Sequence, residues 1–220
     1  MKKLALVIGV ALIAGTVWVL RPALSDSNYG DLSEYARKEN TMSGILEGPV
    51  EHAVLAGGCF WCVEAVYEHI EGVISAVSGY TGGTVANPSY GQVITGKTGH
   101  AEAVKIAFNS EVISYKEILK IFWKSHDPTT LNRQGADVGT QYRSAVFYAD
   151  EEQKRIAEES LKEAQELFSG KIVTEISSLG EFYEAEDYHQ DYFANNPYAG
   201  YCRVVIAPKL EKLGLSGETY

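Results

Sequence analysis

The sequence has few basic side chains relative to its acidic ones. Its 19 lysine and arginine residues are outnumbered by 29 aspartate and glutamate residues, which gives a formal net charge of −10. Proteins that bind nucleic acid neutralise phosphates with clustered lysine and arginine, and no such cluster occurs here. The composition therefore argues against a nucleic-acid partner.

Cysteine is also scarce, with only Cys59, Cys62 and Cys202 in the whole chain. An odd number of cysteines cannot all be paired in structural disulfides, so at least one thiol is left for redox chemistry. The five histidines form no His-x3–5-His pair, so a zinc site at Cys59 and Cys62 would lack its two other ligands. We therefore expect no metal.

Charge is absent from residues 4–20, an apolar stretch that follows Lys2 and Lys3. A basic start followed by such a stretch predicts an export signal, with small residues near Ser25 suited to cleavage. The stretch is close to the roughly 20 residues that span a bilayer, so an uncleaved membrane anchor is the alternative. Either way we expect a periplasmic or other extracytoplasmic protein.

Composition and periodicity divide the whole chain into four parts. We predict a signal or anchor at 1–25, a polar linker at 26–50, a catalytic domain at 51–212 and a tail at 213–220. Alternation and apolar runs predict strands at 52–56, 73–78, 101–108, 144–148 and 172–176. Residues 179–201 are aromatic and polar, and we expect them to form a coil wrapped on the core.

Helices are predicted between these strands. Val63, Val66, Tyr67 and Ile70 share one helical face. Ser114 with Glu117 and Asp150 with Gln153 are typical helix starts. The order β-α-β followed by β-α-β-α-β predicts an α+β fold, a two-layer sandwich with a mixed sheet and a ferredoxin-like, split βαβ core.

Cys59 follows Gly57 and Gly58, where a predicted strand turns into a predicted helix. A helix N-terminus presents unpaired N–H groups and partial positive charge, both of which favour a thiolate, the nucleophilic form of cysteine. We therefore interpret Cys59 as a nucleophile whose thiolate the helix stabilises. A buried structural cysteine is the alternative.

Cys59 and Cys62 also fit a thioredoxin-like dithiol, or a catalytic thiol with a resolving partner. The residues between them, Phe60 and Trp61, are large apolar groups beside a reactive sulfur. They would form a cage for a small apolar group such as a methyl, unless they are only core residues at a helix start.

The run Gly-Cys-Phe-Trp-Cys at 58–62 resembles the signature of the peptide methionine sulfoxide reductases of the A type. Further stretches resemble that family in the same order and spacing, and together they span about 150 residues. They are Gly79–Gly83, Asn87–Tyr90, Thr98–Val104, His126–Pro128, Asp137–Ser144, Ala185–Gln190 and Gly200–Cys202.

The resemblance implies roles for individual residues. Glu102 matches the family's catalytic acid, a carboxyl kept protonated so that it can donate to the sulfoxide oxygen. Tyr90 and Tyr142 match hydroxyls that bind the same oxygen, and Asp137 matches a residue that positions them. The two aromatic residues between the cysteines match the pocket for the methyl group.

The implied reaction is reduction of the S epimer of methionine sulfoxide, free or in proteins, which repairs oxidised proteins. Cys59 attacks the sulfur and becomes a sulfenic acid, which a resolving thiol converts to a disulfide. Cys62 is nearest and is our first choice, with Cys202, expected in a flexible tail, as the second. Thioredoxin or a similar dithiol would reduce the disulfide, and no cofactor is implied.

Two other functions remain open from the residues alone. A thioredoxin-like disulfide oxidoreductase would use Cys59 and Cys62 but would leave Glu102 and the tyrosines without a role. A non-enzymatic peptide-binding module would give no reason for the Cys-Phe-Trp-Cys run. We expect a monomer.

Overall fold

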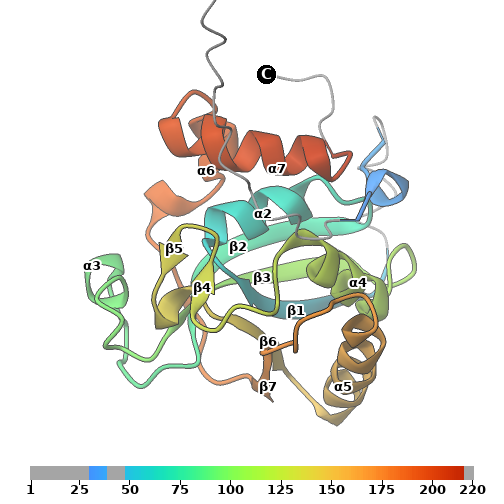
Figure 1. Cartoon of the computed structure of the whole chain (residues 1–220), viewed down its shortest axis with the longest axis horizontal. Helices are drawn as coiled ribbons and strands as arrows, with labels where there is room; N and C mark the ends of the chain where they lie inside the picture. Colours follow the sequence, from blue (N-terminus) through green and yellow to red (C-terminus); the bar gives the residue numbers. More distant parts are fainter. Residues whose placement is uncertain (1–29, 39–47, 216–220) are drawn as a thin grey trace, which may run out of the picture.

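A computed structural model of the chain describes residues 30–38 and 48–215. Its centre is a six-stranded sheet with the order β7-β6-β1-β3-β2-β8. The strands are β1 (Val50–Gly57), β2 (Val73–Thr81), β3 (Ala101–Asn109), β6 (Ser144–Tyr148), β7 (Glu175–Ser178) and β8 (Tyr183–Glu184). Figure 1 shows helices gathered on one side of this sheet.

The split βαβ core is present. Helix α2 (Phe60–Glu68) connects β1 to β2, and β3 lies between these two strands. Helix α4 (Tyr115–Ser125) lies between β3 and β6 in the chain, and β1 separates that second pair of strands. Neighbouring strands in this core are antiparallel, whereas β7 runs parallel to β6, so the sheet is mixed. The predicted α+β fold is therefore confirmed.

Local sequence signals account for the helix boundaries. The Ser114 hydroxyl accepts a hydrogen bond from the Glu117 N–H, and the Glu117 carboxylate accepts one from the Ser114 N–H, so α4 begins with a capping box. Asp150 caps helix α5 (Glu151–Gln165) by accepting from the Gln153 N–H.

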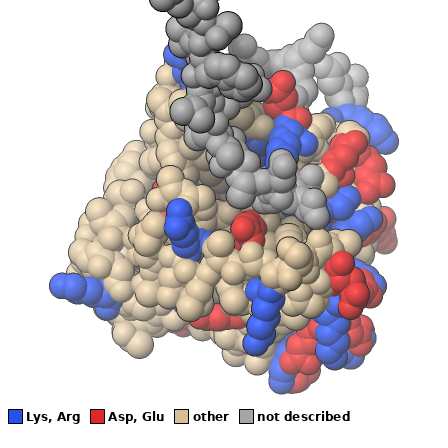
Figure 2. Space-filling model, in the orientation of Figure 1, with Lys and Arg blue, Asp and Glu red and all other residues tan. Residues whose placement is uncertain are grey.

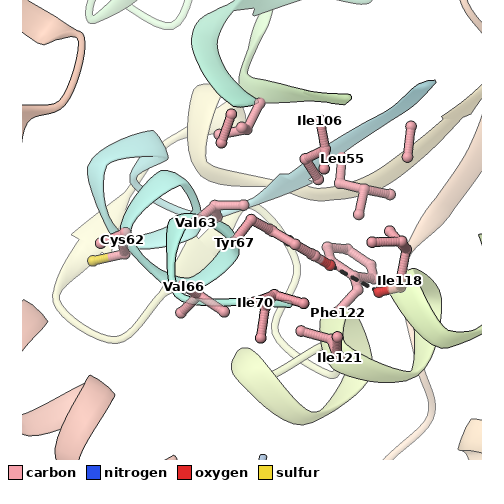
Figure 3. Packing of buried hydrophobic residues seen from close by; sticks show 14 of the residues in the cluster. Leu55, Cys62, Val63, Val66, Tyr67, Ile70, Ile106, Ile118, Ile121 and Phe122 are labelled. Carbon is pink, nitrogen blue, oxygen red and sulfur yellow. Dashed lines mark hydrogen bonds between the residues drawn. The ribbon is translucent and has the colours of Figure 1, made fainter. Parts of the chain in front are cut away.

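The main core lies between the sheet and the helices. Figure 3 shows Tyr67 of α2 reaching across to α4, where its hydroxyl donates a 2.8 Å hydrogen bond to the Ile118 carbonyl. Cys62 lies on the other side of α2, with its sulfur pointing away from this cluster. A smaller set of buried residues packs on the opposite face of the sheet, including Val54 and Phe147. Alternation along β1 sends neighbouring side chains to the two faces, as a strand requires.

The C-terminal part differs from the predicted coil. It contains β8, which pairs with β2, and short helices: a 3-10 turn at Asp187–His189 and helix α6 (Tyr192–Asn195). Residues Cys202–Ile206 form a π-helical turn that runs into α7 (Ala207–Lys212). Cys202 is fully buried there, so its placement in a flexible tail was wrong. Elements this short carry no periodicity, and only the surface they pack on defines them.

Three smaller differences concern loops and one strand. Strand β7 begins at Glu175, later than the predicted 172–176, because Ile172 turns into the core before the strand starts. A short hairpin of β4 (Arg133–Gln134) and β5 (Asp137–Val138) and helix α3 (Tyr90–Val93) were not predicted.

The predicted signal or anchor at 1–25 lies outside the described residues, and no helix in the described ranges is long and apolar enough to cross a membrane.

Candidate active site

Cys59 is the residue immediately before α2 and lies under the β4–β5 hairpin. Gly58 precedes it with φ +95°, a conformation that favours glycine. A Cβ at Gly58 would lie 2.6 Å from the Cβ and Cγ of Gln134 on β4, so the hairpin packs directly on this backbone. Glycine at position 58 is therefore required by a tight strand-to-helix turn under a covering hairpin.

One cavity of about 200 Å³ collects the residues predicted for catalysis and methyl binding. Its lining comes from β3, α2, α3, β5 and the turn that ends at Tyr142, segments far apart in the sequence. The lining residues are Cys59, Phe60, Trp61, Tyr90, Glu102, Asp137, Tyr142 and Tyr201. All but Tyr201 had been predicted.

Glu102 lies on β3 and is 2% exposed. Its Oε2 accepts a 3.1 Å hydrogen bond from the N–H of Phe60, the first residue of α2. Burial raises the pKa of this carboxyl to about 8, and the nearby Asp137 acts in the same direction. Glu102 therefore keeps its proton near neutral pH, directly beside the Cys59 backbone.

The electrostatic surroundings of Cys59 differ from the prediction. Its side chain is 8% exposed, and burial raises the pKa of its thiol well above the ordinary value. No side-chain cap forms at Cys59, and the Phe60 N–H donates to Glu102 instead of to sulfur. The predicted stabilisation of the resting thiolate by the helix N-terminus was therefore wrong, because loss of hydration outweighs it.

Cys62 shares a hydrogen bond with Cys59. This contact, the positive charge of Lys209 and the hydroxyl of Tyr201 together lower the pKa of the Cys62 thiol to about 7, against the effect of burial. The Tyr201 hydroxyl lies 3.7 Å from the Cys62 sulfur. The surroundings therefore favour a thiolate at Cys62 over a thiolate at Cys59.

The two predicted oxygen-binding tyrosines are fixed by separate contacts. The N–H of Tyr90 donates a 2.9 Å hydrogen bond to Oε1 of Glu186. Tyr142 ends a turn whose Thr140 hydroxyl donates to the Gly96 carbonyl at 3.1 Å. The second of these bonds joins the loop of Tyr142 to the loop after α3. Burial raises the pKa of Tyr90 to about 12 and also raises that of Tyr142, so both hydroxyls stay protonated and can donate.

The wall formed by Phe60 and Trp61 is held by aromatic residues that the sequence did not single out. The Trp61 ring stacks on Tyr192 with centroids 3.7 Å apart and planes 7° apart. Its Nε1–H donates to Nδ1 of His189 at 3.2 Å, and burial lowers the pKa of His189, which favours the neutral ring needed to accept. The dense aromatic composition of 179–201 was the one signal that could have indicated this role.

Tyr201 closes the site from the C-terminal side. Its hydroxyl donates a 2.8 Å hydrogen bond to Oδ2 of Asp137, and its ring meets Trp61 edge-on at 5.8 Å. The next residue, Cys202, is outside the cavity lining and has a pKa raised by burial and by Cys62.

The face over α3, β4 and β5, on the left of Figure 2, carries few charged side chains, in contrast to the region of α4 and α5.

No group of three or more cysteine, histidine, aspartate or glutamate side chains with the geometry of a metal site occurs in residues 30–38 and 48–215.

Comparison with known proteins agrees with this geometry. The family model described as peptide methionine sulfoxide reductase matches residues 51–217. The peptide methionine sulfoxide reductase MsrA of Leptospira borgpetersenii is 60% identical over 163 residues, covering 74% of this chain and 93% of its own. The MsrA of Saccharolobus solfataricus is 57% identical over 163 residues, covering 74% and 92%.

Solved structures give the same result. Reduced Mxr1 from Saccharomyces cerevisiae superposes with a TM-score of 0.67 at 35% identity, covering 70% of this chain and 89% of its own. Methionine sulfoxide reductase A of Corynebacterium diphtheriae has a TM-score of 0.64 at 34% identity, covering 70% and 79%. This chain therefore belongs to the peptide methionine sulfoxide reductase family, type A.

Proposed function

We propose that Cys59 is the nucleophile of this enzyme, which reduces the S epimer of methionine sulfoxide, free or in proteins, to methionine. The observation that carries the assignment is the pairing of Cys59 with Glu102, a buried protonated carboxyl, in one small cavity. A thiol nucleophile beside a proton donor is the arrangement that sulfoxide reduction requires.

The sulfoxide methyl group lies against Phe60 and Trp61 in this proposal, and the sulfoxide oxygen faces Glu102. The hydroxyls of Tyr90 and Tyr142 donate to the same oxygen. The scarcity of charge around α3, β4 and β5 suits an uncharged side chain as substrate. Asp137 holds the hydroxyl of Tyr201 at the edge of the same cavity through a hydrogen bond.

In the first step the thiolate form of Cys62, which its pKa of about 7 makes available near neutral pH, takes the proton of Cys59 as a general base. The Cys59 thiolate attacks the sulfoxide sulfur while Glu102 gives its proton to the oxygen. The oxygen is transferred to Cys59, which becomes a sulfenic acid, and methionine leaves. The sulfoxide gains two electrons and Cys59 loses two.

In the second step the Cys62 thiol attacks the sulfenic acid, which forms the Cys59–Cys62 disulfide and releases water. The Cys202 thiol then attacks the Cys62 sulfur, which forms a Cys62–Cys202 disulfide and releases Cys59 as a thiol. A thioredoxin-like dithiol reduces the final disulfide and is itself oxidised. Burial of Cys202 means that its turn has to open for this exchange.

The test is turnover of the two separated epimers of a methionine sulfoxide peptide with dithiothreitol, with Cys59→Ser as the control. Reduction of the S epimer alone, lost in Cys59→Ser, is the expected result. Substantial turnover by folded Cys59→Ser would remove Cys59 as the nucleophile.

We also propose export, on the apolar stretch at 4–20 after two lysines, and a monomeric enzyme. Cell fractionation tests the first proposal: recovery of the full-length protein only in the cytosol would contradict it. Light scattering of the purified protein tests the second. An exported enzyme needs its reducing equivalents delivered across the membrane.

A further inference from the structure

Glu64 is a buried carboxyl that the proposed reaction does not use. It lies on α2, and it is 1% exposed. It does not line the cavity at Cys59. A buried carboxyl is costly unless its oxygens accept hydrogen bonds, so its contacts point to a role.

Its two oxygens join three segments of the chain. Oε1 accepts a 3.0 Å hydrogen bond from the Ser78 hydroxyl on β2, and Oε2 accepts a 3.3 Å bond from the Tyr192 N–H at the start of α6. The N–H of Asp191 also donates to this carboxyl. Asp191 has φ +50° and ψ 34°, a left-handed conformation that only surrounding contacts hold in place.

Tyr192 connects this anchor to the substrate pocket. Its ring is stacked on the Trp61 indole, with centroids 3.7 Å apart. Trp61 lines the cavity, and Glu64 lies three residues after it on the same helix. The carboxyl of Glu64 therefore holds the backbone of the residue whose ring supports the pocket wall.

We propose that Glu64 is a positioning residue for substrate selection: by binding the N–H groups of Asp191 and Tyr192, it fixes Tyr192 against Trp61 and so sets the width of the methyl pocket. This inference rests on the proposed role of Trp61 in that pocket. The function of Glu64 is that of a hydrogen-bond acceptor, and its charge is not required.

The selectivity between a methyl and an ethyl sulfoxide measures the width of the pocket. One methylene in a tight apolar pocket is worth roughly 10- to 200-fold in kcat/KM. The experiment compares kcat/KM for methionine sulfoxide and ethionine sulfoxide peptides, both as the S epimer, for the full chain and its variants. The ratio of the two values is independent of the fraction of folded enzyme, so a merely structural defect leaves it unchanged.

Glu64→Leu keeps the side-chain bulk and removes both acceptor oxygens, and the methyl-to-ethyl ratio should fall up to about tenfold, the upper end for loss of one neutral hydrogen bond. Glu64→Gln should retain the ratio, because its oxygen accepts from Tyr192 and its amide donates to Ser78. If Glu64→Leu does not fold, Glu64→Ala serves in its place with the same expected fall.

The route through Tyr192 is tested by a double-mutant cycle. Tyr192→Ala should lower the ratio by itself, and Glu64→Leu added to it should change the ratio no further. The matched control is Glu71→Leu, which removes a carboxyl just beyond α2 that pairs with Lys38 at 3.5 Å, and it should leave the ratio unchanged.

An unchanged ratio in Glu64→Leu, with a lowered ratio in Tyr192→Ala, would overturn the inference while leaving the proposed function intact. If Glu64→Leu lowered the methyl-to-ethyl ratio equally with Tyr192 present and with Tyr192 replaced by alanine, the proposed action of Glu64 through Tyr192 would likewise be contradicted. Failure of the proposed function would appear separately, as turnover by Cys59→Ser.

Discussion

Oε2 of Glu102 accepts a 3.1 Å hydrogen bond from the N–H of Phe60. This bond joins β3, one of the two central strands of the sheet, to the first residue of α2, next to the nucleophile. The acid and the helix N-terminus are thus one structural unit.

Replacement of Glu102 by Gln should slow methionine release by about 10²–10⁴-fold, the range typical of a general acid. Single-turnover measurement of methionine formed per enzyme, without reductant, isolates this step. Formation of the disulfide afterwards should be little changed. A Glu102→Gln variant that releases methionine at the wild-type rate would contradict the role.

The same step should depend on pH through Glu102. Its pKa is raised to about 8 by burial, so the carboxyl is protonated below that value and loses its proton as the pH rises through it. The rate of methionine release should therefore fall above about pH 8. In Glu102→Gln this decline should be absent. A wild-type profile that rises steadily from pH 7 to pH 10 would be inconsistent with acid catalysis by Glu102.

The order of thiols can be determined with two variants treated with one equivalent of substrate. Cys202→Ser should form the Cys59–Cys62 disulfide, because Cys62 lies one turn from Cys59 and its N–H donates to the Cys59 carbonyl at 3.1 Å. Cys62→Ser should accumulate sulfenic acid at Cys59, because Cys202 is buried outside the cavity. Dimedone labelling with mass spectrometry distinguishes the products. Sulfenic acid in Cys202→Ser and none in Cys62→Ser would reverse the proposed order.

The free energy of unfolding should decrease as the pH rises through the range where Glu64 is protonated only in the folded state. Burial raises its pKa from 4.5 to about 7. Because the folded pKa is higher, the unfolded chain binds fewer protons between these values, and the free energy of unfolding decreases as the pH rises through this window. Urea denaturation at pH 5 and pH 8 should show a smaller decrease for Glu64→Gln than for the wild type. An equal decrease in both proteins would assign the pH dependence to other groups.

Gly58→Ala should destabilise the turn that presents Cys59. Alanine at this position would have to adopt a positive φ, and its Cβ would lie 2.6 Å from the Cβ and Cγ of Gln134. We therefore expect the free energy of unfolding to fall by about 1–3 kcal/mol. Thermal unfolding measures the cost, and turnover should fall with it. Gly180→Ala is the matched control, since its Cβ would meet no atom within 4 Å. Equal melting temperatures for Gly58→Ala and Gly180→Ala would contradict the packing argument.

The sequence by itself determined the local features of this protein. The capping pair Ser114–Glu117, the strand 101–108 and the spacing of Cys59 and Cys62 are set by residues near one another in the chain, and the structure follows them. Periodicity and caps act over a few residues, so one sequence is enough to predict them. The resemblance to the family added Glu102, Tyr90, Tyr142 and Asp137, which the structure gathers around one cavity.

Only the tertiary structure decided the rest. Tyr201 meets Asp137 across 64 residues, and Trp61 meets His189 across 128. Neither contact leaves a local pattern, because each depends on how the C-terminal segment packs. Burial likewise turned Cys59 from an expected resting thiolate into a thiol with a raised pKa, and Cys202 from an expected tail residue into a core residue. Exposure to water is a property of the folded whole, and it is what sets the ionisation of these groups.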